Sequence, residues 1–480
     1  MSARKVLPPV FLAISIFIVY LRTIAPGLTW ANVGADGGDF VTAAATWGIP
    51  HPTGYPTYLL LAKLFQLFPL GSLAFRTNLL SALAAVLAVV LVYALLVWTE
   101  ASPVRGNWQA GLLSAVAFGL SPLFWSQAVI TEVYTLQAAF LAGALFLALQ
   151  PSTLPLDRWR GLLLGLALGN HLTSLFFVPP VMVTAAWRGG WKFAWRSLLR
   201  SLAWLGVGLL VYLSLPLRAL SNPPVNWGNP ITPRRFLWLV SGELYQRNLF
   251  DLTLTGIFER ARAVAGLLLE QFALPGLFLA LVGLLFFFKP TRLYFLTLFV
   301  ALVYGLFAII YASFDSYVYL LPVFLSFSIW LGLGLGGSFP LESRSRTRWV
   351  VFLVGLALCF GLAFQRWPVV DASQDQRAEA FGAQMLADLP PRAMVLASGD
   401  RAIFALWYFH FALGQRPDLA ILVPDFFGTD WYLETLRVRY PALRWEGQVI
   451  RADDLAMDNP GRPLCRVAYF ETLDLVCTSP

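Results

Sequence analysis

Charged side chains are scarce in this 480-residue chain: they make up 12% of it, whereas hydrophobic residues make up 58%. Soluble domains carry roughly twice that share of charge. Apolar runs long enough to cross a bilayer recur through the first three quarters of the sequence. The composition therefore excludes an ordinary soluble protein and predicts a polytopic membrane protein.

Cysteine is also rare, with 3 residues in the chain, which excludes a disulfide-rich scaffold. Cys359 lies in an apolar run, whereas Cys465 and Cys477 lie in the polar C-terminal region. These two could form a disulfide if that region faces an oxidising compartment. Only their position supports the pair, so the sequence leaves the pairing open.

Motifs for soluble cofactors are missing as well. The chain has no Walker loop, no dinucleotide-binding glycine fingerprint, no HExxH and no CxxC pair, which argues against ATP, nicotinamide or structural zinc. The net charge of +8 does not indicate nucleic acid, because Lys and Arg fall in short loops between apolar runs. We therefore expect membrane lipids, and no nucleic acid, among the partners.

The apolar runs and the loop charges together predict about eleven transmembrane helices, with the N-terminus inside and the C-terminus outside. This topology requires a break at Gly169-Asn170-His171, because one continuous helix over 161–187 would place a basic cluster outside. The sequence thus predicts an α-helical membrane domain over 1–366. Two long external loops interrupt this domain, at 25–78 and 218–264.

The last quarter of the chain has the composition of a soluble domain. Segments 392–399 and 419–424 are predicted strands, and 402–413 and 429–438 show helical patterns. Alternating strands and helices predict a small external α/β domain over 367–480.

The first external loop carries the main candidates for chemistry. Asp36 and Asp39 lie just beyond a membrane span, in a chain with little charge. Such a pair could supply a general base with its helper, or hold a divalent cation. The alternative is a helix N-terminus, where acidic residues favour the dipole. The residues alone leave these possibilities open.

Further polar residues are predicted to face the same external side. Ionisable groups near membrane depth are costly, so each is a candidate for the substrate site. They are His51, Glu132, His171 and Asp315. Structural roles are the alternative for each of them, such as an N-cap at Asp315. The one-sided cluster predicts a cavity that faces outward.

The second external loop is basic and aromatic. The guanidinium group of arginine binds phosphate through two parallel hydrogen bonds, and the faces of aromatic rings suit sugars or lipid headgroups. The arginines expected to bind the donor phosphate are Arg218, Arg234, Arg235 and Arg247. The alternative is an interfacial helix whose arginines reach the headgroups. A basic loop opposite an acidic loop fits transfer of a group from an anionic lipid.

Several segments of the chain resemble a family of polytopic membrane proteins whose eukaryotic members are protein O-mannosyltransferases, with the GT-C glycosyltransferase fold. The segments are Pro26-Gly27-Leu28-Thr29, Asp36-Gly37-Gly38-Asp39-Phe40-Val41-Thr42-Ala43-Ala44, Gly48-Ile49-Pro50-His51-Pro52-Thr53-Gly54-Tyr55-Pro56 and Arg76-Thr77-Asn78-Leu79-Leu80-Ser81-Ala82. The motif-rich part of the resemblance covers about residues 25–100.

The resemblance implies inverting transfer of mannose or another hexose from a polyprenyl-phosphate donor, with an acid of the first external loop as base. Asp36 stands where the family has Asp, and Asp39 where Glu is more frequent. Tyr55 and Arg76 are expected in the substrate site. The acceptor stays open among protein Ser or Thr, lipids and growing glycans, and so does a divalent cation. The expected location is a bacterial inner membrane, with the active site outside.

Two other classes of function remain as alternatives. A secondary transporter would bury acids at broken helices, but it should show repeat symmetry and sites at the midplane. A non-catalytic scaffold of an envelope-glycan assembly complex would use the external domain, but it leaves the acidic loop without a role.

Overall fold

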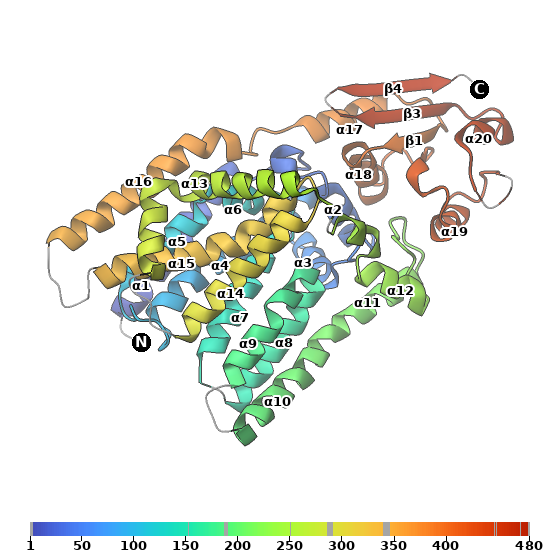
Figure 1. The fold of residues 1–480 in the computed structure, drawn as a ribbon. Helices are drawn as coiled ribbons and strands as arrows, with labels where there is room; N and C mark the ends of the chain where they lie inside the picture. Colours follow the sequence, from blue (N-terminus) through green and yellow to red (C-terminus); the bar gives the residue numbers. More distant parts are fainter. Residues whose placement is uncertain are drawn as a thin grey trace.

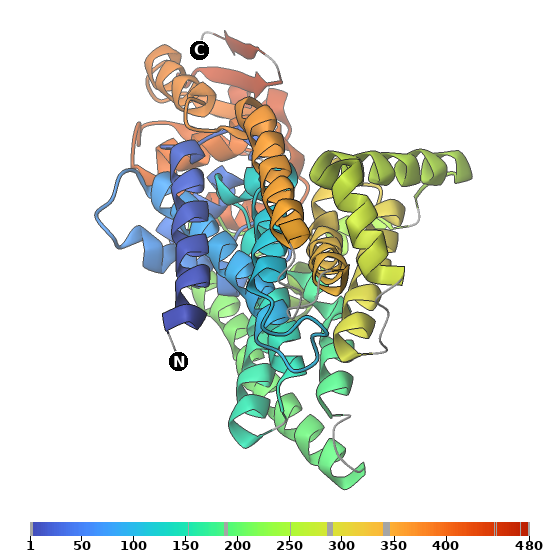
Figure 2. The same ribbon diagram turned by 90° about the vertical axis from the view of Figure 1, so that its left-hand side faces the viewer.

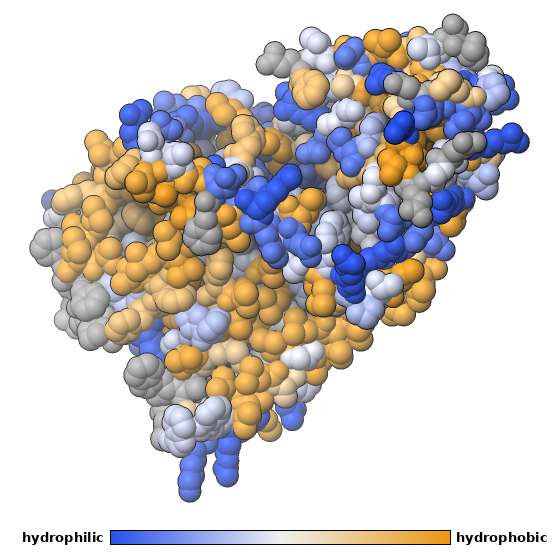
Figure 3. Space-filling view, turned by 45° about the vertical axis from the view of Figure 1, so that its right-hand side comes forward, coloured by the Kyte–Doolittle hydropathy of each residue, from blue (hydrophilic) through white to orange (hydrophobic). Residues whose placement is uncertain are grey.

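A computed structural model describes residues 3–151, 153–186, 191–249, 251–285, 291–338, 346–445, 447, 449–470 and 472–478. Its helices form a bundle, and a small sheet domain lies at one end of it, next to helix α2 (Figure 1). Hydrophobic side chains gather over the bundle and hydrophilic ones over the sheet domain (Figure 3). The predicted helical membrane protein with a small C-terminal α/β part is confirmed.

In the described part of the chain, 6 helices are long and apolar enough to cross a membrane. They are α4 (Leu73–Val97), Trp191–Ala219 with α10 (Trp191–Leu209), α13 (Leu254–Leu285), α14 (Arg292–Ile310), Ser316–Ser338 with α15 (Leu321–Ser338), and α16 (Arg346–Val370). Shorter apolar helices lie in α1 (Ala3–Thr23), α7 (Tyr134–Leu149) and α9 (Val178–Ala186). The number of about eleven spans stays a prediction.

The remaining helices of the bundle are short or interrupted. They are α2 (Gly37–Ala45), α3 (Pro56–Gln66), α5 (Trp108–Gly119), α6 (Pro122–Ala128), α8 (Leu154–Asn170), α11 (Ser214–Ala219) and α12 (Pro233–Val240). The break predicted at Gly169-Asn170-His171 is present, because α8 ends at Asn170 and His171 adopts an extended backbone with φ −156°. A 3-10 turn, Leu172–Phe176, then leads into α9.

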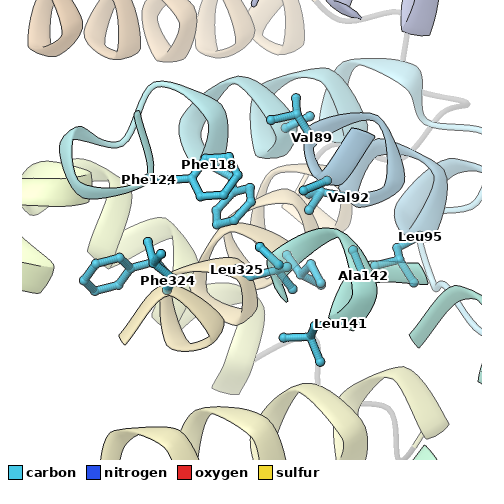
Figure 4. Close-up of a cluster of buried hydrophobic side chains, with 14 of the residues drawn as sticks. Val89, Val92, Leu95, Phe118, Phe124, Leu141, Ala142, Phe324 and Leu325 are labelled. Carbon is cyan, nitrogen blue, oxygen red and sulfur yellow. The ribbon is translucent and has the colours of Figure 1, made fainter. Parts of the chain in front are cut away.

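Buried apolar side chains from several helices form the interior of the bundle. Figure 4 shows Val89, Val92 and Leu95 of α4 together with Phe118, Phe124, Leu141, Ala142, Phe324 and Leu325 of α5, α6, α7 and α15. Phe118 and Phe124 stack with ring centroids 4.1 Å apart. Dense van der Waals packing of this kind holds membrane helices together, because the hydrophobic effect does not drive helices to associate within lipid.

Glycines let α8 and α10 approach each other closely. Gly165 of α8 faces Gly208 of α10, and a Cβ built on Gly165 would lie 2.7 Å from the Cα of Gly208. Small residues at such a crossing allow backbone-to-backbone contact within a membrane. Larger side chains at Gly165 therefore have no room.

Gly165→Leu is expected to force α8 and α10 apart and to destabilise the protein by roughly 1–3 kcal/mol, the usual cost of overpacking. Gly206→Leu on α10 is the matched control, because a Cβ at Gly206 meets nothing within 4 Å. Thermal unfolding in detergent measures both variants. An equal loss of stability in the two would contradict close packing at this crossing.

Helix α13 consists of two limbs. The chain turns at Ala273, which has φ 52° and ψ 171°, just before Pro275. Figures 1 and 2 show the first limb lying across the end of the bundle and the second running along it. Leu254 and Phe258 on the first limb are exposed. An exposed apolar helix in this orientation is typical of the membrane interface.

The sheet of the C-terminal domain has the strand order β2-β1-β3-β4. Its strands are β1 (Met394–Ser398), β2 (Ala420–Leu422), β3 (Leu464–Tyr469) and β4 (Leu473–Thr478). β1 is parallel to β2 and β3, whereas β4 is antiparallel to β3. The two predicted strands correspond to β1 and β2. Arg466 and Asp474 interrupt the apolar pattern of β3 and β4, which the sequence therefore did not predict.

Helices α17 (Arg377–Asp388), α18 (Asp400–Trp407), α19 (Asp430–Arg439) and α20 (Ala452–Asp458) accompany the sheet. The predicted helical segments correspond to α18, with the turn that follows it, and to α19. Cys465 and Cys477 face each other across β3 and β4 and form a disulfide, the pairing that the sequence left open. Cys359 of α16 is a free thiol.

Candidate active site

The two carboxylates of the first external loop occupy the start of α2. Asp36 is the residue before the helix, and Asp39 lies in its first turn. The Asp39 side chain is fully buried, whereas that of Asp36 is 38% exposed. Both positions favour the helix dipole, but only Asp36 is open to a substrate.

His51 joins the two carboxylates. Asp39 Oδ2 accepts hydrogen bonds from the backbone N–H of His51, at 2.9 Å, and from its Nδ1, at 2.7 Å. The other ring nitrogen, Nε2, lies 3.8 Å from Asp36 Oδ2. Asp39 thus fixes the orientation of the imidazole, and the imidazole stands beside Asp36. The structure separates the roles of the pair: Asp39 positions His51, and Asp36 faces the cavity.

The second external loop holds the segment that carries His51. Pro50 and Pro52 keep this segment out of a helix. The Ile49 N–H donates to the Val225 carbonyl at 2.8 Å, and the Trp227 N–H donates to the Ile49 carbonyl at 3.2 Å. These bonds tie the two external loops together at the site.

The segment before Asp36 is anchored by Asp375, which follows the last membrane helix. Asp375 Oδ2 accepts hydrogen bonds from Thr29 Oγ1 at 2.6 Å, from the Trp30 N–H at 2.9 Å and from the Ala31 N–H at 2.7 Å. This anchor joins the approach to Asp36 to the C-terminal part of the chain.

The C-terminal domain also packs directly on α2. A Cβ built on Gly38 would lie 2.6 Å from the backbone oxygen of Phe404 in α18. Only glycine allows this contact, which brings Asp400 and Phe404 into the wall of the site. The C-terminal domain is therefore part of the site.

A cavity of about 340 Å³ lies between these elements. Its lining includes Asp36, His51, Tyr55, Glu132 and Asp315, all of which the sequence predicted for the substrate site. An apolar groove of about 310 Å³ adjoins the cavity and includes His171 and Tyr55 in its wall. The structure brings these residues of the first loop, of the turn before α7 and of the turn after α14 to one place.

Hydrogen bonds hold the two turns in position. Ser81 Oγ donates to the Glu132 carbonyl and accepts from the Glu132 N–H. Arg260 of α13 donates to the Tyr311 carbonyl at 2.8 Å, to the Ser313 carbonyl at 2.9 Å and to Ser316 Oγ at 2.7 Å. The guanidinium of Arg260 therefore holds the turn that carries Asp315 in place.

The charges around Asp36 set its protonation. Its recessed position, away from bulk water, raises the pKa of Asp36 to about 6, against the lowering effect of the His51 charge. The carboxylates of Asp400, Asp39 and Asp315 add to the rise. Burial lowers the pKa of His51, but Asp36 and Asp39 outweigh burial and raise it to about 9. At neutral pH the site therefore holds a carboxylate next to an imidazolium.

Burial favours the protonated form of Glu132. It is almost fully buried, and burial together with the charges of Asp36 and Asp315 raises its pKa well above the usual value. A neutral carboxyl group at this position can donate a hydrogen bond instead of only accepting one.

The arginines of the second loop are not found in the cavity. Arg218 donates to the Gly48 carbonyl at 3.4 Å and lies over the Trp47 ring. Arg235 forms an ion pair with Glu434, with Nη1 and Oε2 2.7 Å apart. The carboxylate of Glu434 holds Arg235 outside the cavity. The buried guanidinium of Arg218 makes its one hydrogen bond to Gly48, while its Nε and Nη2 have no hydrogen-bond partner in the described structure.

The other predicted arginines lie outside the cavity as well. Arg234 and Arg247 are exposed and line neither the cavity nor the groove. Arg76 donates to the carbonyls of Gln66, Leu70 and Gly71, and so closes the turn between α3 and α4. The geometry therefore gives Arg76 a structural contact and no contact with the cavity.

Sequence reasoning missed Asp400, which also lines the cavity. A usable signal existed for Asp400, because it directly follows the predicted strand 392–399. Polar residues at the carboxyl ends of parallel strands are typical of ligand sites. Tyr245, one of the aromatic residues of the second loop, lines the cavity from a 3-10 turn, Glu243–Asn248.

Comparison with known proteins agrees with this architecture. Residues 36–194 match the family described as the N-terminal domain of protein O-mannosyl-transferase TMEM260, and residues 378–442 match TMEM260-associated domain 2. Protein O-mannosyl-transferase TMEM260 of Mus musculus is 27% identical over 463 residues, 86% of this chain and 62% of the relative. The Dictyostelium discoideum protein of that name is 25% identical over 505 residues, 92% of this chain and 60% of the relative.

The fold has solved counterparts. The crystal structure of ArnT from Cupriavidus metallidurans bound to undecaprenyl phosphate matches with a TM-score of 0.62 and 15% identity, over 98% of this chain and 93% of that one. The apo structure of the same protein matches with a TM-score of 0.57 and 16% identity, over 97% and 93% of the two chains. The chain therefore shares the fold of ArnT.

These matches confirm the resemblance drawn from the motifs around Asp36 and His51. The match to the TMEM260 N-terminal domain begins at Asp36 itself. The chain spans about 60% of the length of the curated relatives. For a chain with this fold, the cavity beside Asp36 and His51 is the candidate active site.

Proposed function

We propose that this chain transfers a sugar, mannose or another hexose, from a polyprenyl-phosphate donor to an acceptor hydroxyl on the extracytoplasmic side of a bacterial inner membrane, with inversion. The observation that carries the proposal is the position of Asp36, open to the cavity and oriented beside His51. The O-mannosyl-transferase names of the relatives support sugar transfer to protein. The ArnT complex with undecaprenyl phosphate supports a lipid-phosphate donor.

The cavity and the groove suit the two halves of such a donor. Apolar residues line the groove, among them Leu172, Leu175, Phe176 and Phe307, and a polyprenyl chain would lie there. The adjoining cavity is polar and would hold the sugar. Asp400 of the external domain faces the same cavity, and this position suits contact with the acceptor.

The reaction follows from this geometry as a single displacement. The Asp36 carboxylate takes the proton of the acceptor hydroxyl while the hydroxyl oxygen attacks the anomeric carbon. The bond between that carbon and the phosphate oxygen breaks on the opposite side, and polyprenyl phosphate leaves. Glu132, as a neutral acid, would donate a hydrogen bond to the sugar. In the described chain, no group of three or more His, Cys, Asp or Glu is placed to hold a metal ion, so we assign no metal ligands.

Transfer from labelled donors tests the proposal. Purified protein is incubated with polyprenyl-phosphate mannose, glucose or arabinose, with membrane extract or Ser- and Thr-containing peptides as acceptors. Incorporation of label from at least one donor is the expected result. If no donor transfers its sugar and no donor binds, the transferase hypothesis fails, and transport or scaffolding takes its place.

The pH dependence of transfer should report the two groups beside each other in the site. Asp36 must be ionised to act as base, so activity should be lost as the pH falls through about 6. His51 carries its charge until the pH rises through about 9, so activity should decline again above that value. The profile of kcat/KM against pH measures both limbs. A profile that stays flat down to pH 4 would exclude Asp36 as the base.

A further inference from the structure

The proposed donor carries an anionic phosphate, yet the expected arginines lie elsewhere. In the described ranges, no Lys or Arg lines the polar cavity or the apolar groove. The phosphate must therefore be held by other hydrogen-bond donors. The region where the cavity meets the groove shows which ones are available.

Tyrosines surround this junction. Tyr55, Tyr245, Tyr311 and Tyr319 line both the polar cavity and the apolar groove. In a polyprenyl-phosphate sugar the phosphate lies between the apolar chain and the polar sugar. A donor with its chain in the groove and its sugar in the cavity would thus place its phosphate among these tyrosines.

His171 adds a donor at the same place. Its ring centroid lies 5.9 Å from that of Tyr55 and 5.7 Å from that of Tyr319. The Thr173 backbone N–H donates to His171 Nδ1 at 3.2 Å. A backbone N–H can only donate, so in the neutral ring the proton sits on Nε2.

The remaining ring nitrogen of His171, Nε2, is available to bind a ligand. The residue is 93% buried, since its relative exposure is 7%, and it lies in the groove wall. The structure gives Nε2 no partner within the described residues. In the groove wall, this N–H is therefore free to donate a hydrogen bond to a ligand.

We propose that the four tyrosines and His171, a tyrosine–histidine collar, bind the donor phosphate through neutral O–H and N–H groups in place of arginines. This inference rests on the proposed function. The donors lie where the departing phosphate oxygen takes up the electron pair of the broken bond, and hydrogen bonds to that oxygen strengthen as its charge develops. His51, on the cavity side of Tyr55, supplies the nearby positive charge, with ring centroids 5.1 Å apart.

Binding of undecaprenyl phosphate and of undecaprenol to the full chain in nanodiscs tests the collar. The two probes differ only in the phosphate. His171→Phe and Tyr319→Phe are each expected to weaken binding of the lipid phosphate by about tenfold, the effect of losing one hydrogen bond to a charged group. Binding of the lipid alcohol should stay unchanged.

Tyr317→Phe is the matched control, because Tyr317 lines the cavity but not the groove, and Arg247→Gln tests the rejected alternative. Neither should alter the preference for the phosphate. Unchanged phosphate binding in both collar variants, equal loss of both probes, or a loss confined to Arg247→Gln would overturn the collar. This assay needs no sugar transfer, so failure of the collar is distinguishable from failure of the proposed transferase reaction.

Discussion

Asp36→Asn is expected to lower sugar transfer by about a thousandfold while leaving lipid-phosphate binding nearly unchanged. Asn occupies the same space but cannot take a proton, and removal of a general base typically costs a factor of about 10²–10⁴. The Asp36 side chain faces the cavity, so the substitution buries no new polar group. The loss should therefore appear in kcat and not in donor affinity or thermal stability.

Asp388→Asn provides the control for the removal of one carboxylate. Asp388 is an exposed acid at the end of α17 and does not line the cavity. Single-turnover transfer at pH 7.5, with donor binding measured in parallel, compares the two variants. If Asp36→Asn kept more than about a tenth of the wild-type rate, another group would have to be the base.

Asp39→Asn is expected to lower kcat by about a hundredfold through His51. The buried carboxylate holds the imidazole by two hydrogen bonds, and misplacement of a catalytic group by about 1 Å can cost that much. Asp39 also raises the pKa of His51. Its loss should therefore move the alkaline limb of the pH–rate profile to lower pH, which a purely structural defect would not do.

A double-mutant cycle with His51→Gln examines this coupling. Since Asp39 acts through His51, the double variant should lose hardly more activity than His51→Gln alone. Additive losses would show that Asp39 acts independently, as a second base or as a ligand. Thermal unfolding of each variant separates a local effect from loss of the fold.

The membrane part could be predicted well where one physical constraint dominates. One continuous helix over 161–187 would have put a basic cluster on the outer side of the membrane, so we predicted a break at Gly169-Asn170-His171. Helix α8 ends there. The strands β1 and β2 carry unbroken apolar runs, so their sequence identified them. The number of spans stays a prediction, because short helices such as α6 satisfy their backbone hydrogen bonds inside the bundle and need not cross the bilayer.

The site shows where sequence reasoning stops. From the sequence, Asp36, His51, Glu132 and Asp315 were predicted to face one side of the membrane. The free-energy cost of an ionisable side chain at membrane depth depends on residue type alone, so the sequence suffices for this prediction. Burial then decided what the sequence left undecided, because it removed Asp39 from the cavity and left Asp36 in it.

The partners of the arginines were the other feature that the sequence could not predict. The arginines were expected at the phosphate because of their chemistry, but carbonyls, a carboxylate and an aromatic ring hold Arg76, Arg218 and Arg235 elsewhere. Glu434 lies 199 residues from Arg235, so no local pattern reveals this partner. Asp400 follows the predicted strand 392–399, but its place in the cavity depends on the contact between Gly38 and Phe404, which no local pattern reveals.

The stereochemistry of transfer tests the central claim most directly. Wild-type protein and Asp36→Asn are given the labelled polyprenyl-phosphate sugar that the wild type accepts, and the anomeric configuration of the product is determined by NMR. A single displacement with Asp36 as base predicts a product of opposite configuration to the donor, formed by the wild type only. Retention of configuration, or inverted product formed equally fast by Asp36→Asn, would contradict it.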